Sequence, residues 1–360
     1  MANEKNTPQQ LSVSVVIPAY NSAQFLGAAI ESALCQTRRP IEILVVDDGS
    51  TDETPRVLGQ FGAPVIVIRQ ANQGQSAARN HAIARATGDA IMFLDADDLL
   101  LPTCIERSVA AMESDAAIDV VYSDCHLVDS EAKRLGVFSE IYPAPRPSGM
   151  ILGELGYRWS VINISSTLVR RSALTGVTFD GTLTRSGADD FDLWRQLAAK
   201  GRFQYVNEVL ACYRCHSGQM SATRIGEALD GAIEVQRRII EMKEFEQVSS
   251  RSKARLYCHH GARKAMLGEC EIARQMFRRA IQSNPFYPTS YALLGLGLLG
   301  DRALQYAVLK RRQVMSGEIN QMISGTAVLP ANLQRDKPSC SPLPALLTAG
   351  SAVAEGGRHG

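Results

Sequence analysis

The sequence lacks a strong charge of either sign. Its 360 residues carry 38 Lys and Arg against 37 Asp and Glu, and the formal net charge is +1. Because no excess charge creates a field that attracts polyanions, nucleic acid is not expected as a partner. The same balance gives no electrostatic reason for binding an anionic membrane.

Long hydrophobic runs and export signals are also missing. No stretch of about 18 or more apolar residues is found, so the sequence predicts no membrane-spanning helix. The first residues, MANEKNTPQQ, lack the charged and then apolar layout of a signal peptide. The 8 cysteines are scattered through a long chain, unlike the framework of a disulfide-rich secreted domain. Together these features predict a soluble, cytoplasmic protein.

Strand and helix patterns alternate four times in the first part of the chain. Apolar, β-branched runs predict buried strands, each followed by a helical pattern, at 12–17, 41–46, 64–68 and 90–94. This alternation predicts an α/β domain with a mainly parallel central sheet and helices on both faces. In such sheets, ligands bind beyond the carboxyl ends of the strands.

Acidic residues gather where two of these strands end. Asp47 and Asp48 follow the second strand, and Asp95, Asp97 and Asp98 follow the fourth. Two carboxylates about 5 Å apart repel by roughly 3 kcal/mol at an effective dielectric constant of about 20. A hard divalent cation, Mn²⁺ or Mg²⁺, would neutralise the second group. The alternative is that Asp98 caps a helix while Asp95 and Asp97 are solvated.

The remaining chain changes character twice. A fifth strand is predicted near 118–124 and an irregular stretch after it, whereas only helical periodicity is visible later, with a tetratricopeptide-like pair near 252–298. The last residues are rich in Pro, Ser, Gly and Ala and have little to bury. The predicted regions are a flexible N-terminus at 1–11, an α/β domain at 12–222, a helical region at 223–315 and a disordered tail at 324–360.

Four motifs in order resemble the family 2 glycosyltransferases: VSVVIPAYN, EILVVDDGSTDET, NQGQSAARNHAIARATGDAIMFLDADD and DDFDLWRQL. The resemblance spans about Ser12 to Ser221. It implies a GT-A nucleotide-sugar fold, a divalent metal cofactor (Mn²⁺ or Mg²⁺), and transfer with inversion from a nucleoside-diphosphate sugar to an acceptor hydroxyl. UDP-sugars are expected because they are frequent in the family. Processive relatives carry a Q-x-x-R-W motif and membrane helices, whereas this chain has LWRQL, so one sugar is expected per encounter.

The resemblance also assigns the nucleotide-sugar site. Pro18 and Tyr20 would hold the base, with Tyr20 stacked on it, and Asp48 would bond to the base. Arg79 would steady the nucleotide or its diphosphate, and Asp95 would contact the ribose. On the residues alone, Tyr20 could instead be a core aromatic and Arg79 a member of a surface ion pair.

The catalytic base and the metal ligands follow from the same resemblance. Asp97 would bind the metal, and Asp190 would take the proton from the acceptor, with Asp189 standing where the family usually has Glu. His216, in YRCHSGQMS, would reach the metal or the diphosphate. The alternatives are that Asp189 or Asp190 merely caps its helix and that His216 is structural. The C-x-x-C-H spelling at 212–216 also matches haem attachment, which is disfavoured because that reaction needs export.

The acceptor is expected to be a glycan, a lipid-linked sugar or a small molecule, in cell-surface polysaccharide or glycolipid assembly. A lipid-linked acceptor would bring the enzyme to the inner face of the membrane as a peripheral protein. A second hypothesis is a sugar-nucleotide-binding module without turnover, with the helical region recruiting a protein partner. A third, nucleotidyl transfer, lacks the glycine-rich triphosphate loop that it would need at the first strand end.

Overall fold

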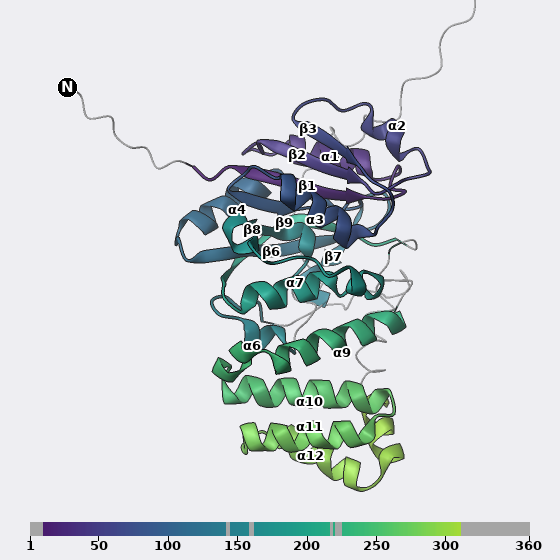
Figure 1. Cartoon of the computed structure of the whole chain (residues 1–360), viewed down its shortest axis with the longest axis vertical. Coiled ribbons are helices and arrows are strands. Elements are labelled where there is room, and N and C mark those ends of the chain that lie inside the picture. The colour runs from purple at the N-terminus through teal and green to yellow at the C-terminus, as the bar shows by residue number, and fades with distance from the viewer. Residues whose placement is uncertain (1–9, 142–144, 158–161, 217–218, 220–224, 311–360) are drawn as a thin grey trace, which may run out of the picture. The chain divides into compact units, whose positions relative to one another are not determined.

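The computed structural model describes residues 10–310 except 142–144, 158–161, 217–218 and 220–224 (Figure 1). Most of the predicted flexible N-terminus and the whole of the predicted disordered tail at 324–360 lie outside the described residues. These two regions therefore stay predictions.

A nine-stranded sheet forms the centre of the first part of the chain (Figure 1). Its order is β3-β2-β1-β4-β8-β6-β9-β5, and β7 pairs with β6. In chain order the strands are β1 (Val13–Ala19), β2 (Glu42–Asp47), β3 (Val65–Arg69), β4 (Ala90–Phe93), β5 (Leu99–Leu100), β6 (Ile118–Val128), β7 (Arg134–Val137), β8 (Thr167–Arg170) and β9 (Arg202–Arg214).

The sheet is parallel in its first half and mixed in its second. β1 runs parallel to β2 and β4, and β2 runs parallel to β3, as the alternating pattern predicts. Beyond β4, however, β8 is antiparallel to both β4 and β6, and β5 is antiparallel to β9. β6 and β9 are again parallel. The later strands are not joined by regular helical crossovers, so connections that the sequence pattern does not reveal decide their direction.

Helices follow most of the strands. Their bounds are α1 (Leu26–Leu34), α2 (Thr54–Leu58), α3 (Gln75–Arg85), α4 (Cys104–Glu113), α5 (Phe138–Ile141), α6 (Leu152–Leu155), α7 (Asp189–Ala198), α9 (Ile225–Glu241), α10 (Ser250–Met266), α11 (Cys270–Ser283) and α12 (Pro288–Leu298). Short 3₁₀ turns are η1 (Ile164–Ser166), η2 (Arg171–Leu174), η3 (Gly181–Ser186) and η4 (Lys243–Gln247).

Two apolar cores lie on the two faces of the sheet because side chains alternate along each strand. Val15 and Ile17 of β1 belong to one core, with apolar residues of α1 and α4. Val16 belongs to the other core, with residues of α3 and α7. Val235 and Ile239 of α9 are fully buried in this second core. The first helix after the predicted boundary at 222 therefore packs as part of the α/β domain.

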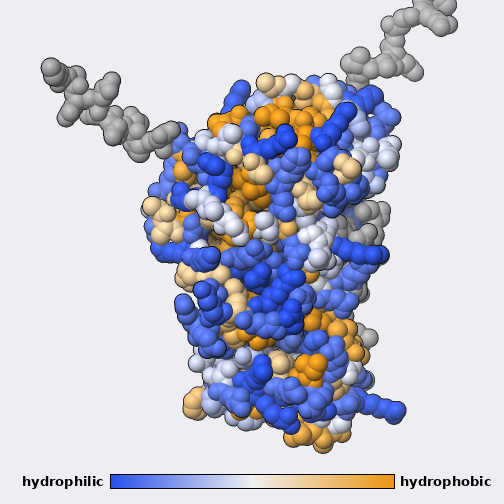
Figure 2. Space-filling view, in the orientation of Figure 1, coloured by the Kyte–Doolittle hydropathy of each residue, from blue (hydrophilic) through white to orange (hydrophobic). Residues whose placement is uncertain are grey.

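The later helices have an apolar cluster of their own. Phe277 of α11 is fully buried there, together with Leu304 of the helical residues 301–310. Figure 2 shows apolar residues at the surface near the end of this stack. Leu298 and Leu299, at the C-terminal end of α12, are exposed. Among the described residues, no helix has both the length and the apolar character that crossing a bilayer requires.

Candidate active site

Three strand ends with unusual residues lie at one edge of the sheet. Ala19 of β1 pairs with Asp47 of β2, and Val16 of β1 pairs with Phe93 of β4. Because these neighbouring strands are parallel, the residues after them leave the sheet on the same side. The segments after β1, β2 and β4 therefore begin at the same edge of the sheet.

The loops after β1 and β2 are tied to each other. The amide N–H of Thr51 donates to Asn21 Oδ1 at 2.8 Å, and that of Asn21 donates to Ser50 Oγ at 3.0 Å. Asn21 has a φ of 48°, and this sharp turn follows Tyr20 directly. Tyr20 is 49% exposed, so it is not a core aromatic. Pro18 is buried in β1 beside Val46.

Asp48 holds the loop that leads into α3. Its Oδ1 accepts hydrogen bonds from Gln70 Nε2 at 2.8 Å and from the Gln73 amide at 2.9 Å. Its Oδ2 accepts from the Gly74 amide at 2.7 Å, and the residue is 2% exposed. Asp48 thus shapes the wall of the site, and its direct bond to a base stays a prediction. Asp47 closes its own turn by accepting from the Ser50 amide at 2.9 Å.

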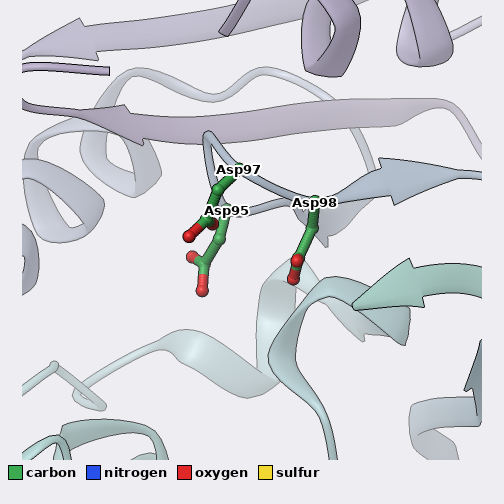
Figure 3. Close-up of side chains that lie close together, drawn as sticks. All are labelled: Asp95, Asp97 and Asp98. Carbon is green, nitrogen blue, oxygen red and sulfur yellow. The ribbon is translucent and has the colours of Figure 1, made fainter. Parts of the chain in front are cut away.

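The carboxylates of Asp95, Asp97 and Asp98 lie together after β4 (Figure 3), with one oxygen of each within 4.8 Å of the others. Asp98 is 2% exposed, and its Oδ2 has no hydrogen-bond partner among the described residues. Burial, and then the charges of Asp97 and Asp95, raise the pKa of Asp98 well above its usual value. A buried carboxylate with an unpaired oxygen beside two others fits a divalent cation.

The alternative that Asp98 caps a helix is wrong. Its Oδ1 accepts from the Arg214 amide of β9 at 2.8 Å, and β5 rather than a helix follows it. The next helix, α4, has Thr103 at its N-cap position. The pairing of β5 with β9 brings the two segments together, so sequence neighbours alone could not reveal this role.

His216 lies against the acidic loop. Its Nε2 is 3.0 Å from Asp97 Oδ2, and its ring centroid is 5.0 Å from that of Phe25. Arg214 Nε donates to the Asp97 carbonyl at 2.7 Å, which fixes β9 to this loop. His216 therefore lies beside the acidic cluster, and its role toward a metal or a diphosphate stays a prediction. Cys212, the first cysteine of C-x-x-C-H, is 3% exposed within β9, where haem could not be attached.

Arg79 joins two acidic segments inside the protein. Its Nη2 donates to Asp95 Oδ1 at 2.6 Å and its Nη1 to Asp189 Oδ2 at 3.0 Å, while its side chain is 3% exposed. The surface-ion-pair alternative for Arg79 is wrong. Burial lowers the pKa of Arg79, but the charges of Asp95 and Asp189 outweigh it, so the guanidinium stays charged. Burial, opposed by Arg79, also raises the pKa of Asp95.

Asp189 and Asp190 begin α7 but have different environments. Asp189 is 1% exposed and accepts from Ser76 Oγ at 2.8 Å as well as from Arg79. Asp190 is partly buried, and within the described part of the chain its Oδ1 accepts only from the next amide, that of Phe191, at 2.6 Å. The N-cap position belongs to Ala188, so neither carboxylate is the cap of this helix.

The surroundings of Asp190 suit a base. Burial, followed by the adjacent charge of Asp189, raises the pKa of Asp190 to about 7, although Arg79 acts in the opposite direction. A general base is most effective when its pKa lies near the working pH. Asp189 is thus held by hydrogen bonds, whereas no hydrogen bond to the second carboxylate oxygen of Asp190 is found among the described residues.

Sequence reasoning missed the residues that hold Asp189. Ser76 contacts both Asp189 and the hydroxyl of Thr184 on η3. A signal was present, because Ser76 and Arg79 are three residues apart in S-x-A-R-N and so lie on one face of α3. Their partners Thr184 and Asp189 are more than 100 residues away in the chain, however, and only the fold brings them together.

Comparison with known proteins gives one consistent result. The family model for glycosyl transferase family 2 matches residues 14–175. An uncharacterized glycosyltransferase of Nostoc sp. is 34% identical over 220 residues, which are 59% of this chain and 68% of that protein. The UDP-Glc:alpha-D-GlcNAc-diphosphoundecaprenol beta-1,3-glucosyltransferase WfaP of Escherichia coli is 31% identical over 220 residues, or 60% of this chain and 82% of that protein.

Solved structures share the fold at low sequence identity. TarS of S. aureus in complex with UDP-GlcNAc has a TM-score of 0.58 and 18% identity, covering 84% of this chain and 92% of that one. The mannosyltransferase PcManGT of Pyrobaculum calidifontis, in complex with GDP-Man and Mn²⁺, has a TM-score of 0.55 and 19% identity. That match covers 89% of this chain and 88% of the mannosyltransferase. These likenesses support the GT-A type of fold.

Proposed function

Since the chain belongs to the family 2 glycosyltransferases, we propose that it transfers one sugar, with inversion, from a metal-bound UDP-sugar to an acceptor hydroxyl. A nucleoside-diphosphate sugar is the donor class for which this fold is built, and two structural neighbours hold UDP-GlcNAc and GDP-Man. UDP is chosen because WfaP is named as a UDP-Glc enzyme.

One observation carries this proposal: the buried Arg79 links the acidic cluster, where the donor would bind, to the segment of the candidate base Asp190. Arg79 bonds to Asp95, beside the acidic cluster, and to Asp189, the neighbour of Asp190. The cluster and the candidate base are therefore held in one rigid arrangement. Preorganised positioning of this kind supplies a large part of the rate enhancement in group transfer.

The donor end would be held by residues at the strand ends. The half-exposed ring of Tyr20 offers a face on which the base can stack, and Asp48 keeps the neighbouring loop in place. Asp97 and Asp98, with His216 beside them, would hold the divalent metal. A metal bound there would act as a Lewis acid toward the departing diphosphate.

Asp190 would carry the proton transfer. One of its oxygens accepts the proton of the acceptor hydroxyl as the hydroxyl oxygen forms a bond to the anomeric carbon. The bond between that carbon and the diphosphate breaks on the opposite face, and the electron pair leaves with the diphosphate. Because the pKa of Asp190 is about 7, a useful fraction is ionised at neutral pH.

The acceptor proposed is a hydroxyl of a lipid-linked glycan or a growing cell-surface polysaccharide. WfaP, by its name, acts on a sugar carried by diphosphoundecaprenol. A lipid carrier would bring the enzyme to a membrane surface as a peripheral protein.

A donor and acceptor panel tests the proposal. The full chain is incubated with UDP- and GDP-sugars in the presence of Mn²⁺ or Mg²⁺. The acceptors are synthetic oligosaccharides and sugars linked to a lipid through a diphosphate, and release of the nucleoside diphosphate is measured. Asp190→Asn should abolish transfer while leaving donor binding intact, and Asp97→Ala should weaken metal-dependent donor binding. Asp115→Asn is the control, because Asp115 is exposed and pairs with Arg202. Donor binding without turnover over the whole panel would favour a binding module instead.

A further inference from the structure

The first helix of the C-terminal helical region makes an unusually close contact with the segment just before the candidate base. At Gly231 of α9, an added Cβ would lie 2.2 Å from Ser186 Oγ and 2.7 Å from the Cβ of Ala188. The Cβ of Ser186 would also lie 2.6 Å away, and neither Cβ can move aside by side-chain rotation because each is fixed to its backbone. Only glycine permits this approach, so α9 sets the position of residues 186–188, directly before Asp189 and Asp190.

An arginine of α9 pairs with carboxylates on both sides of residues 186–188. Arg238 Nη1 is 2.8 Å from Asp180 Oδ2, at the N-cap position of η3, and 3.2 Å from Asp192 Oδ1 in the first turn of α7. Asp192 is 1% exposed, and Arg195 of its own helix also bonds to it at 2.8 Å. Two arginines thus compensate this buried carboxylate, and loss of Arg238 would leave its charge less well paired.

α9 is itself firmly attached to the α/β domain. Val235 and Ile239 are buried in the core that includes α7. Gln236 is fully buried as well, and its Nε2 donates to the carbonyl of Gly156, after α6, at 2.8 Å. In Figure 1, α9 lies alongside α7. The helix is therefore a rigid support for the segment that it touches.

We propose that α9 positions the catalytic base through Gly231 and Arg238, so that the helical region forms part of the active-site scaffold. Both are positioning residues, since neither bonds to Asp190. The inference rests on the proposed function insofar as Asp190 is the base. It gives the helical region a role in the reaction, beyond recruiting a partner.

A matched pair of arginine variants tests this inference in the full-length protein. Arg237 is the sequence neighbour of Arg238, but its partners among the residues that the structure describes are Glu234 and Glu241 of its own helix. Arg238→Ala should lower kcat about tenfold or more and leave the KM for the donor within about twofold, because a misplacement near 1 Å can cost about 100-fold in rate. Arg237→Ala should leave both unchanged. Arg238→Lys keeps the positive charge but lacks the planar guanidinium with its several N–H donors. Its kcat should therefore lie between those of Arg238→Ala and the wild type.

A readout without activity keeps the test independent of the proposed function. Hydrogen exchange at the amides of 187–193 should become faster in Arg238→Ala and stay unchanged in Arg237→Ala. Gly231→Ala should accelerate the same amides, whereas Gly295→Ala should not, since nothing lies within 4 Å of a Cβ added at Gly295. Equal kcat and equal exchange in the two arginine variants would overturn the inference. A wild-type protein without transferase activity would overturn the proposed function, while the exchange comparison would still decide whether α9 positions this segment.

Discussion

Replacing Asp189 by Asn should shift the pH at which the enzyme becomes active. Asp189 and Asp190 are adjacent, and burial together with the charge of Asp189 raises the pKa of Asp190 to about 7. Two carboxylates about 6 Å apart repel by roughly 3 kcal/mol at an effective dielectric constant of about 20. Since one pKa unit corresponds to about 1.4 kcal/mol, removal of this charge should lower the pKa of Asp190 by about one to two units.

Arg79 acts in the same direction. Its Nη1 now bonds to Asp189, so in Asp189→Asn its charge is less compensated and stabilises the ionised form of Asp190 further. A base must be deprotonated to work, so the rate rises as the pH rises through its pKa. The acid limb should therefore move from about pH 7 toward pH 5 to 6, with a lower plateau because a weaker base accepts the proton less readily.

The assay is kcat against pH at saturating donor and acceptor, because that profile reports groups in the enzyme–substrate complex. Asp192→Asn is the control: it removes the same charge from the same helix, but Asp192 is not among the largest influences on the pKa of Asp190. Its acid limb should stay near pH 7 even if its plateau changes. An unchanged or raised apparent pKa in Asp189→Asn would refute the assignment of Asp190 as the base.

Three further substitutions separate the other parts of the site. Tyr20→Ala should weaken donor binding about tenfold, since stacking of a base on an aromatic ring is worth about 1–3 kcal/mol, and calorimetric titration with UDP measures this; an unchanged Kd would exclude stacking. Asp98→Asn should raise the free energy of unfolding of the metal-free protein by about 1 kcal/mol at pH 8. This gain should shrink at acid pH, where the raised pKa of Asp98 leaves the wild-type group neutral. In the variant, the stabilisation by Mn²⁺ should disappear. Denaturant titrations with EDTA or with Mn²⁺ measure both effects, and a variant that Mn²⁺ still stabilises as much as the wild type would show that this carboxylate does not hold the cation. His216→Ala should weaken Mn²⁺ binding in the presence of UDP about tenfold, as loss of a group beside a ligand does. Equal Mn²⁺ affinity in that variant would give His216 a purely structural role.

The first half of the fold could be predicted because its signals are local. β-branched runs such as Val13–Ala19 are buried throughout, which forces them into the middle of a sheet covered on both faces. The second half could not be predicted in the same way. Strands β5 and β8 have only 2 and 4 residues, and their antiparallel pairing depends on partners far along the chain.

The site shows the same division. That Asp95, Asp97 and Asp98 gather at a strand end follows from the sequence, because a turn fixes residues this close together. That Asp98 points at β9 and Arg79 at Asp189 does not follow, since these contacts join segments about 110 residues apart. The residue type determines which reactions and contacts a side chain is capable of. The groups that surround it in the fold determine its ionisation state and its orientation.

The sequence by itself determined the family, the parallel strands of the first half and the chemical groups available for binding and proton transfer, because all of these reside in short motifs. The tertiary structure, in contrast, buries Arg79 between two carboxylates, surrounds Asp189 with hydrogen-bond donors and packs α9 against the residues just before Asp189. The physical reason is that burial and long-range charge pairing set the ionisation and orientation of a side chain. Both depend on what the fold places beside it.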